Sequence, residues 1–142
     1  PTQNAFLHDI HLPQLIKYFG GVVLGISAGS MNCARIVYAQ PEEEGESSPD
    51  FPRWADGLGL TDVNILPHYQ KVKGNILDGL RLFEDITYAD SMGNTFFVLP
   101  DGSYFYQDEA GLLLCGEGYR LRDGILEQLT RNGDVLDIAE LN

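Results

Sequence analysis

The chain has 142 residues, of which 44% are hydrophobic and 21% are charged. This composition predicts one folded core, so we expect a single domain over residues 1–142 or a piece of a larger one. With 21 acidic against 9 basic residues the formal net charge is −12, which argues against nucleic acid or an anionic membrane surface as partner. The absence of a long apolar stretch and of a signal peptide predicts a cytoplasmic protein. Cys33 and Cys115 stand far apart, which predicts buried free thiols.

The first 38 residues predict helix, strand and helix in that order. Apolar side chains between residues 5 and 19 recur at helical spacing, Pro13 interrupts the pattern, and two glycines end it. Residues 22–26 are apolar and rich in β-branched side chains, which predicts a strand buried on both faces of a parallel sheet. Residues 31–38 then predict a helix packed behind that strand.

The remainder of the chain predicts a loop, a strand, a helix and several hairpins. Residues 40–51 are acidic and contain prolines, which indicates a polar loop. Residues 63–66 predict a strand that ends just before His68, and residues 76–84 have helical spacing. Four further short strands with turns between them are predicted at residues 96–99, 104–106, 112–115 and 119–121.

A possible nucleophile lies between the first predicted strand and its helix, in the sequence Gly25-Ile26-Ser27-Ala28-Gly29. This G-x-S-x-G pattern, placed between strand and helix, is typical of a nucleophile elbow, in which a tight turn presents the serine hydroxyl. The next backbone N–H, that of Ala28, could stabilise an oxyanion. The alternative is a serine that only caps the helix.

A serine nucleophile needs a base, and the chain has three histidines. His8 and His11 lie in a polar patch, where exposure on the surface is the simpler interpretation. His68 follows a predicted strand, so it is the favoured base. A purely structural hydrogen bond in a Pro-His-Tyr turn is the alternative for His68.

Three blocks of sequence resemble peptidase family S51, which contains dipeptidase E and cyanophycinase. They are the serine block at residues 25–32, the sequence Gly-Leu-Gly-Leu at residues 57–60 and Asn-Ile-Leu-Pro-His-Tyr at residues 64–69. The family has an α/β fold, a sandwich like class I glutamine amidotransferases with a mostly parallel central sheet. The resemblance implies this fold here, with Ser27 as the nucleophile and His68 as its base.

The chain departs from the family pattern in two places. Family members carry an acidic residue about fifteen positions after the serine, which corresponds to Glu42, but this position lies in a glutamate cluster and the usual aspartate is absent. Glu42 is therefore a candidate to orient His68, and a solvated run of charge is the alternative. Residues 1–6 resemble the sequence that follows the family's glycine-rich oxyanion loop. We therefore expect the chain to be the C-terminal part of a larger domain, with the missing N-terminal segment or another copy as its partner.

The sequence thus predicts a serine peptidase that hydrolyses small peptides through an acyl-enzyme, with no metal and no organic cofactor. An acidic N-terminal residue in the substrate is an expectation from the resemblance to dipeptidase E alone. Two alternatives stay open. One is a cyanophycinase-like hydrolase of β-aspartyl peptides, and the other is a non-catalytic relative that acts as a binding or regulatory domain.

Overall fold

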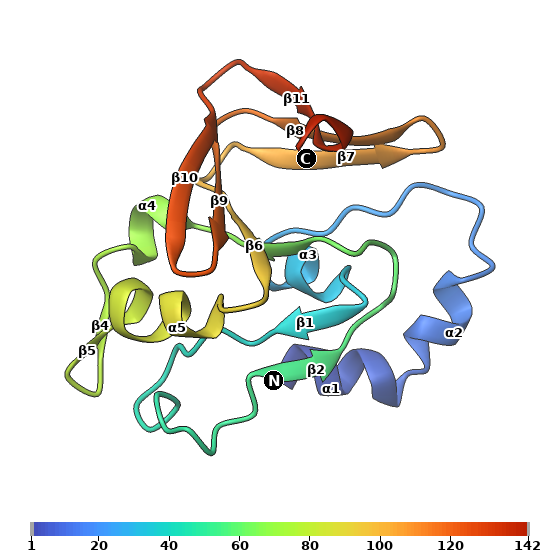
Figure 1. Cartoon of the computed structure of the whole chain (residues 1–142). Helices are drawn as coiled ribbons and strands as arrows, with labels where there is room; N and C mark the ends of the chain where they lie inside the picture. Colours follow the sequence, from blue (N-terminus) through green and yellow to red (C-terminus); the bar gives the residue numbers. More distant parts are fainter. Residues whose placement is uncertain (1, 142) are drawn as a thin grey trace.

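The computed structural model describes residues 2–141 as a set of short helices and short strands, with 24% helix and 31% strand (Figure 1). None of the helices in this range has the length and apolar character that a membrane span requires. The helices are α1 (Thr2–Asp9), α2 (Leu12–Ile16), α3 (Ala28–Asn32), α4 (Tyr69–Val72), α5 (Tyr88–Asp90), a π-helix (Leu82–Thr87) and a 3-10 helix (Ile138–Glu140). The strands are β1 (Ile36–Tyr38), β2 (Trp54–Asp56), β3 (Asn64–Leu66), β4 (Ile76–Leu77), β5 (Leu80–Arg81), β6 (Thr95–Val98), β7 (Tyr104–Asp108), β8 (Gly111–Cys115), β9 (Gly118–Arg122), β10 (Ile125–Thr130) and β11 (Val135–Asp137).

The largest sheet has four strands in the order β10-β9-β6-β3. Only the pair β3 and β6 is parallel, and the other two pairs are antiparallel. The predicted fold class, a glutamine amidotransferase-like sandwich with a mostly parallel central sheet, is therefore wrong for this structure. The predicted hairpins of the C-terminal part are present. The hairpin of β9 and β10 supplies two of the four strands of the largest sheet, so this sheet is mostly antiparallel.

Residues 22–26 run as an extended stretch toward α3 (Figure 1), but they belong to no sheet, so the predicted buried strand is wrong. Val22, Leu24 and Ile26 are 93%, 81% and 72% exposed. The apolar sequence favours burial, but a strand also needs a neighbouring backbone, and no strand of the described residues lies alongside to pair with it. The segment therefore approaches Ser27 as a single extended chain.

Two other expected elements differ from the structure. Residues 36–38 form β1, antiparallel to β2, whereas a helix was expected there. Ile, Val and Tyr favour a strand over a helix, and the pairing of β1 with β2 stabilises the strand. Residues 76–81 form the hairpin of β4 and β5, because Asp78 and Gly79 both adopt positive φ in the tight turn that an Asp-Gly pair favours.

The core lies between the four-stranded sheet and the helical segment at residues 82–90. The side chain of Phe96 on β6 stacks on Tyr38 at 4.5 Å between ring centroids. Across the other face of β6, Phe97 contacts Phe105 of the three-stranded sheet β11-β8-β7 at 5.2 Å. The buried core consists of Tyr38, Leu66, Leu82, Phe83, Ile86, Phe96, Val98 and Leu121.

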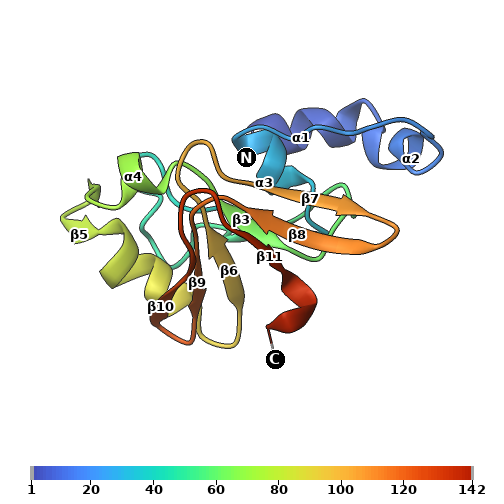
Figure 2. The same cartoon turned by 90° about the horizontal axis from the view of Figure 1, so that it is seen from above.

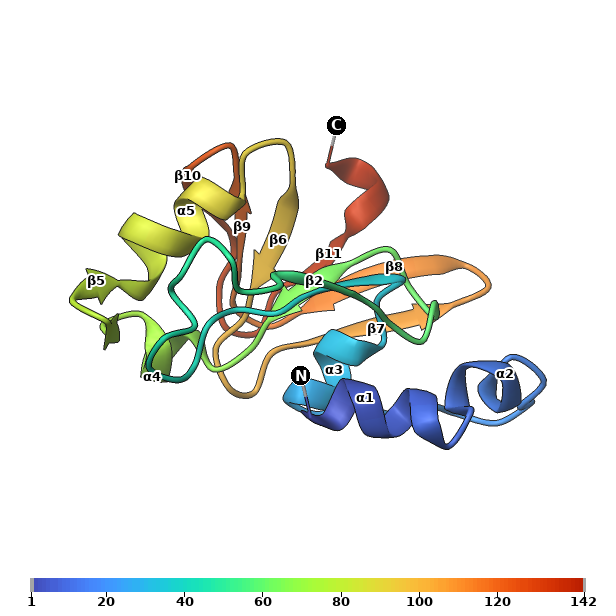
Figure 3. The same ribbon diagram turned by 90° about the horizontal axis from the view of Figure 1, so that it is seen from below.

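Helices α1 and α2 lie at one edge of the molecule, on the opposite side from the β9–β10 hairpin (Figures 2 and 3). The helix predicted between residues 5 and 19 is thus present as two pieces, with Pro13 in the first turn of α2, and neither piece has a buried residue. The chain then runs back from α2 toward α3 below β7 (Figure 1). Cys33 and Cys115 are free and partly buried.

Candidate active site

Ser27 stands in a strained turn immediately before α3. Its backbone has φ 54° and ψ −123°, a combination that residues other than glycine rarely adopt and that tends to occur at functional sites. A Cβ atom on Gly25 would lie 2.8 Å from both the Cys33 Sγ atom and the Gly29 carbonyl oxygen. Glycine at position 25 is therefore required for the turn to close, whereas a Cβ on Gly29 would meet nothing within 4 Å.

His68 lies at the end of β3, as the sequence predicts. Its Nε2 atom is 2.8 Å from the Ser27 Oγ atom, so the expected hydrogen bond between these residues is present. The backbone of His68 is in the left-handed region, with φ 62°, between Pro67 and the first residue of α4. This sharp turn between strand and helix directs the imidazole across to the serine, although 41 residues separate the two in the sequence.

Asp101 is the acid that contacts His68. Its Oδ1 atom lies 2.5 Å from His68 Nδ1. The two residues are brought together because β3 and β6 run parallel in register, with Leu66 opposite Val98, and the carboxyl ends of parallel strands meet at one edge of a sheet. Ser27, His68 and Asp101 therefore form a chain of two hydrogen bonds in the order found in serine hydrolases.

Lys71 and Gln70 of α4 hold Asp101 in place. The Lys71 Nζ atom is 2.6 Å from Asp101 Oδ2, and the backbone N–H of Asp101 donates to the Gln70 Oε1 atom at 3.0 Å. Hydrogen bonds from Lys71 and then from His68 lower the pKa of Asp101 to about 2. The carboxylate is therefore ionised at neutral pH and can only accept hydrogen bonds.

The charge of Asp101 fixes the tautomer of the neutral imidazole. Because the carboxylate accepts, His68 Nδ1 must carry the proton and donate it to Asp101. The unprotonated Nε2 atom is then the acceptor for the Ser27 hydroxyl. This is the state that a general base requires.

Glu42 does not take the orienting role that its position in the sequence suggested. Its side chain is exposed, and its backbone N–H donates to Glu46 Oε2 at 2.8 Å. The Nδ1 atom of His68 is bonded to Asp101 instead, so the expectation for Glu42 is corrected. The sequence could not show which residue matches the acidic position of the family, because four glutamates lie within five positions. In the structure, the pairing of β3 with β6 places Asp101 beside His68.

The other two histidines lie away from Ser27. The His8 ring contacts the backbone oxygen of Asp56 at 2.8 Å, and His11 is exposed at the start of α2. Within residues 2–141 no group of three or more His, Cys, Asp or Glu side chains is arranged to hold a metal ion. The backbone N–H of Ala28 makes no hydrogen bond with any other described residue. It follows Ser27 directly and could donate to an oxyanion.

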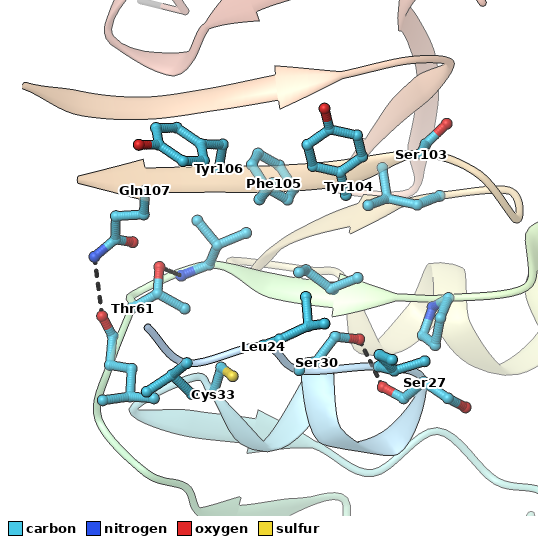
Figure 4. Close-up of a pocket in the computed structure, with 18 of the residues that line it drawn as sticks. Leu24, Ser27, Ser30, Cys33, Thr61, Ser103, Tyr104, Phe105, Tyr106 and Gln107 are labelled. Atoms are coloured by element: carbon cyan, nitrogen blue, oxygen red, sulfur yellow. Dashed lines mark hydrogen bonds between the residues drawn. The ribbon is translucent and has the colours of Figure 1, made fainter. Parts of the chain in front are cut away.

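Two cavities meet at the Ser27–His68 pair. The larger has a volume of about 760 Å³ and lies between the extended segment before Ser27, β3 and β7 (Figure 4). The smaller, of about 260 Å³, has Glu42 and Ala28 in its wall. A substrate that spans both cavities would place its reacting bond beside the serine hydroxyl.

The role of Asp101 was missed in the sequence, although a signal for it exists. The sequences Leu66-Pro67-His68 and Leu99-Pro100-Asp101 each follow an apolar run, so both predict a strand that ends before a polar residue. Two such strands in parallel would bring the histidine and the aspartate together.

No protein-family model, no curated protein and no solved structure matches the chain. The resemblance to peptidase family S51 therefore rests on the sequence motifs alone.

Proposed function

We propose that this chain is a serine hydrolase that cleaves small peptides through an acyl-enzyme. The observation that carries the proposal is the chain of hydrogen bonds from Ser27 Oγ to His68 Nε2 and from His68 Nδ1 to Asp101. The strained backbone of Ser27 supports it further, because such a conformation is costly and tends to persist where function needs it. The motifs shared with peptidase family S51 point to the same serine and histidine.

The reaction follows from these contacts. His68 Nε2 takes the proton of the Ser27 hydroxyl while Oγ bonds to the carbonyl carbon of the substrate, and the Ala28 N–H donates to the carbonyl oxygen as it gains charge. The imidazolium returns the proton to the leaving amine as the C–N bond breaks. Water then attacks the ester, with His68 again as base, and releases the acid and free Ser27. Asp101 stabilises the imidazolium in both steps.

The acidic N-terminal residue that the resemblance to dipeptidase E implies is not part of this proposal, because no side chain in the described lining of the site would recognise a carboxylate. A pocket for a carboxylate requires a cation, and neither cavity beside Ser27 has lysine or arginine in its described lining. Among nearby basic residues, Lys71 is paired with Asp101 and Arg35 with Asp62.

Hydrolysis of the dipeptides Leu-Leu and Asp-Leu by wild type and by Ser27→Ala tests the proposal. We expect measurable hydrolysis by wild type and a loss in kcat of about 10³-fold or more in the variant, with the far-UV circular dichroism unchanged. Equal activity in the two proteins would contradict the mechanism. A higher rate for Asp-Leu than for Leu-Leu would restore the acidic preference, and equal or lower rates would agree with its absence from the proposal.

A further inference from the structure

We infer that the larger cavity binds the substrate as an extended, uncharged peptide, whose backbone pairs with residues 21–25 and whose apolar side chains lie between this segment and β7. This inference rests on the proposed function and names the substrate class for the same site. Three observations support it: the unpaired backbone, the apolar lining and the position of Ser27 at the end of the segment.

The backbone before Ser27 is free to pair. Residues 20–25 make no backbone hydrogen bond to any other described residue, although the segment is extended. An extended backbone with open N–H and C=O groups is the surface to which a peptide adds as a further strand. Exposed groups of this kind are bonded to water in the free protein, so a peptide can replace that water with its own amides at little cost.

The lining of the cavity selects apolar side chains. Leu24 comes from the extended segment, Ile65 from β3 and Phe105 from β7, and Figure 4 shows β7 across the gap from the segment that carries Leu24. The charged groups in the lining are the carboxylates Asp101 and Asp108, so a peptide with acidic side chains would be repelled. The net charge of −12 acts in the same direction.

The extended segment ends at the nucleophile, which connects the groove to the reaction. A strand rises about 3.3 Å per residue, so residues 21–26 offer roughly 20 Å for a bound chain, or about six residues. A peptide paired along this length would place one of its amide bonds beside the Ser27–His68 pair, which lines the same cavity. The volume of about 760 Å³ is also larger than one side chain needs. A dipeptide would occupy only part of the groove.

The test compares three substrates with wild-type protein: the hexapeptide Ser-Ala-Val-Leu-Val-Ala, the same peptide with aspartate in place of both valines, and the dipeptide Leu-Leu. We expect kcat/KM for the apolar hexapeptide to exceed that of each of the other two by about tenfold or more, because burial of each extra apolar group in the groove contributes roughly tenfold or more. Methylation of alternate backbone nitrogens in the hexapeptide should lower its kcat/KM by about tenfold, because it removes the donors that pair with the segment.

A pair of variants localises the effect. Leu24→Asp should raise KM for the apolar hexapeptide by about tenfold, since it puts a charge in the groove. Ile125→Asp is the matched control, because Ile125 is 69% exposed on β10 and does not line the cavity, so its kinetics should equal those of wild type.

The inference is overturned if the dipeptide or the acidic hexapeptide is cleaved as fast as the apolar one, or if N-methylation has no effect. It is also overturned if light scattering shows a wild-type dimer that Leu24→Asp dissociates, since a second copy would then occupy the groove. A failure of the proposed function looks different, because none of the peptides would be cleaved and Ser27 would not react with a fluorophosphonate.

Discussion

The segment at residues 2–26 and the body that follows it differ sharply in packing. None of the residues 2–26 is buried, and the apolar side chains of Val22, Leu24 and Ile26 are largely exposed. In the body, β3 and β6 both contribute to the core, where residues such as Leu66 and Phe96 are completely or almost completely buried. Ser27 stands at the junction between the two regions.

The two regions contribute different residues to the candidate site. The proposed base and acid, His68 and Asp101, follow the ends of the paired strands β3 and β6, whose buried residues belong to the core, so the core fixes their positions. The nucleophile is held instead by a local turn, through the fit of Gly25 against Gly29 and the hydrogen bond to His68. The exposed segment before it remains free to bind a ligand. The predictions below test this division, beginning with the largest expected effect.

Removal of the Asp101 carboxylate should lower kcat far more than removal of the Glu42 carboxylate in the acidic loop. Asp101→Asn should lower kcat for a cleaved peptide by about 10³-fold, because the amide no longer fixes the imidazole tautomer or stabilises the imidazolium. Glu42→Gln should change kcat by less than about twofold, because Glu42 does not contact His68. Steady-state kinetics of both variants provide the comparison. A larger loss in Glu42→Gln than in Asp101→Asn would restore Glu42 as the orienting acid.

The same substitution on the two sides of the junction should have very unequal effects on the free energy of unfolding. Leu66→Ala should lower the free energy of unfolding by about 2–5 kcal/mol, because Leu66 is 1% exposed in the core. Leu24→Ala should change it by less than about 0.5 kcal/mol, because the Leu24 side chain is in solvent. Urea unfolding measures both. If Leu24→Ala proved as destabilising as Leu66→Ala, the exposed segment would be packed in solution and the comparison would fail.

The two glycines of the turn should respond differently to the same added methyl group. Gly25→Ala should destabilise the protein by about 1–3 kcal/mol, because its Cβ would lie 2.8 Å from the carbonyl oxygen of Gly29. Gly29→Ala should leave stability unchanged or slightly raised, because the position is open and alanine favours helix α3. Thermal unfolding of the pair tests this, and equal losses in the two variants would contradict the packing described for the turn.

The smallest expected effect concerns Lys71, which stabilises the ionised form of Asp101. In Lys71→Met the pKa of Asp101 should rise from about 2 toward its ordinary value, because the hydrogen bond and the charge of the lysine are lost. The acid limb of kcat/KM should therefore move to higher pH, with kcat above that limb changed by less than about threefold. Lys71→Arg, which keeps the charge, should restore the wild-type profile. An unchanged profile in Lys71→Met would show that Lys71 has no electrostatic role.

The lowered pKa of Asp101 also predicts how the free energy of unfolding depends on pH. Because it is lower in the folded state than in the unfolded chain, its contribution is complete above the ordinary pKa of about 4 and is lost as pH falls toward about 2. Acid unfolding of wild type should therefore lose stability more steeply across this window than unfolding of Asp101→Asn.

Local features of both fold and site could be predicted from the sequence, and long-range pairing could not. The strand before His68 and the C-terminal hairpins have clear period and turn signals, and they are present. The apolar run at residues 22–26 has the composition of a buried strand, but strand formation depends on a partner that local sequence does not encode. The Asp78-Gly79 pair is itself a turn signal, but the helical spacing of the apolar residues around it favoured a helix over residues 76–84.

The same distinction holds for the proposed catalytic residues. Ser27 and His68 belong to recognisable motifs, whereas Asp101 joins them only through the parallel pairing of β3 with β6. Its neighbour Gly102 and the preceding proline indicate a turn, and nothing local distinguishes it from the other aspartates in turns. The two Leu-Pro sequences predict a contact between His68 and Asp101 only if the strands before them are assumed to pair in parallel.

The central claim, that His68 and Asp101 activate Ser27, is tested most directly by covalent labelling with a fluorophosphonate, followed by peptide mapping with mass spectrometry. We expect one adduct per chain, on Ser27, and a rate that falls by about 10²-fold or more in His68→Gln because the base is lost. No adduct on folded wild-type protein, or the same rate in His68→Gln, would contradict the claim.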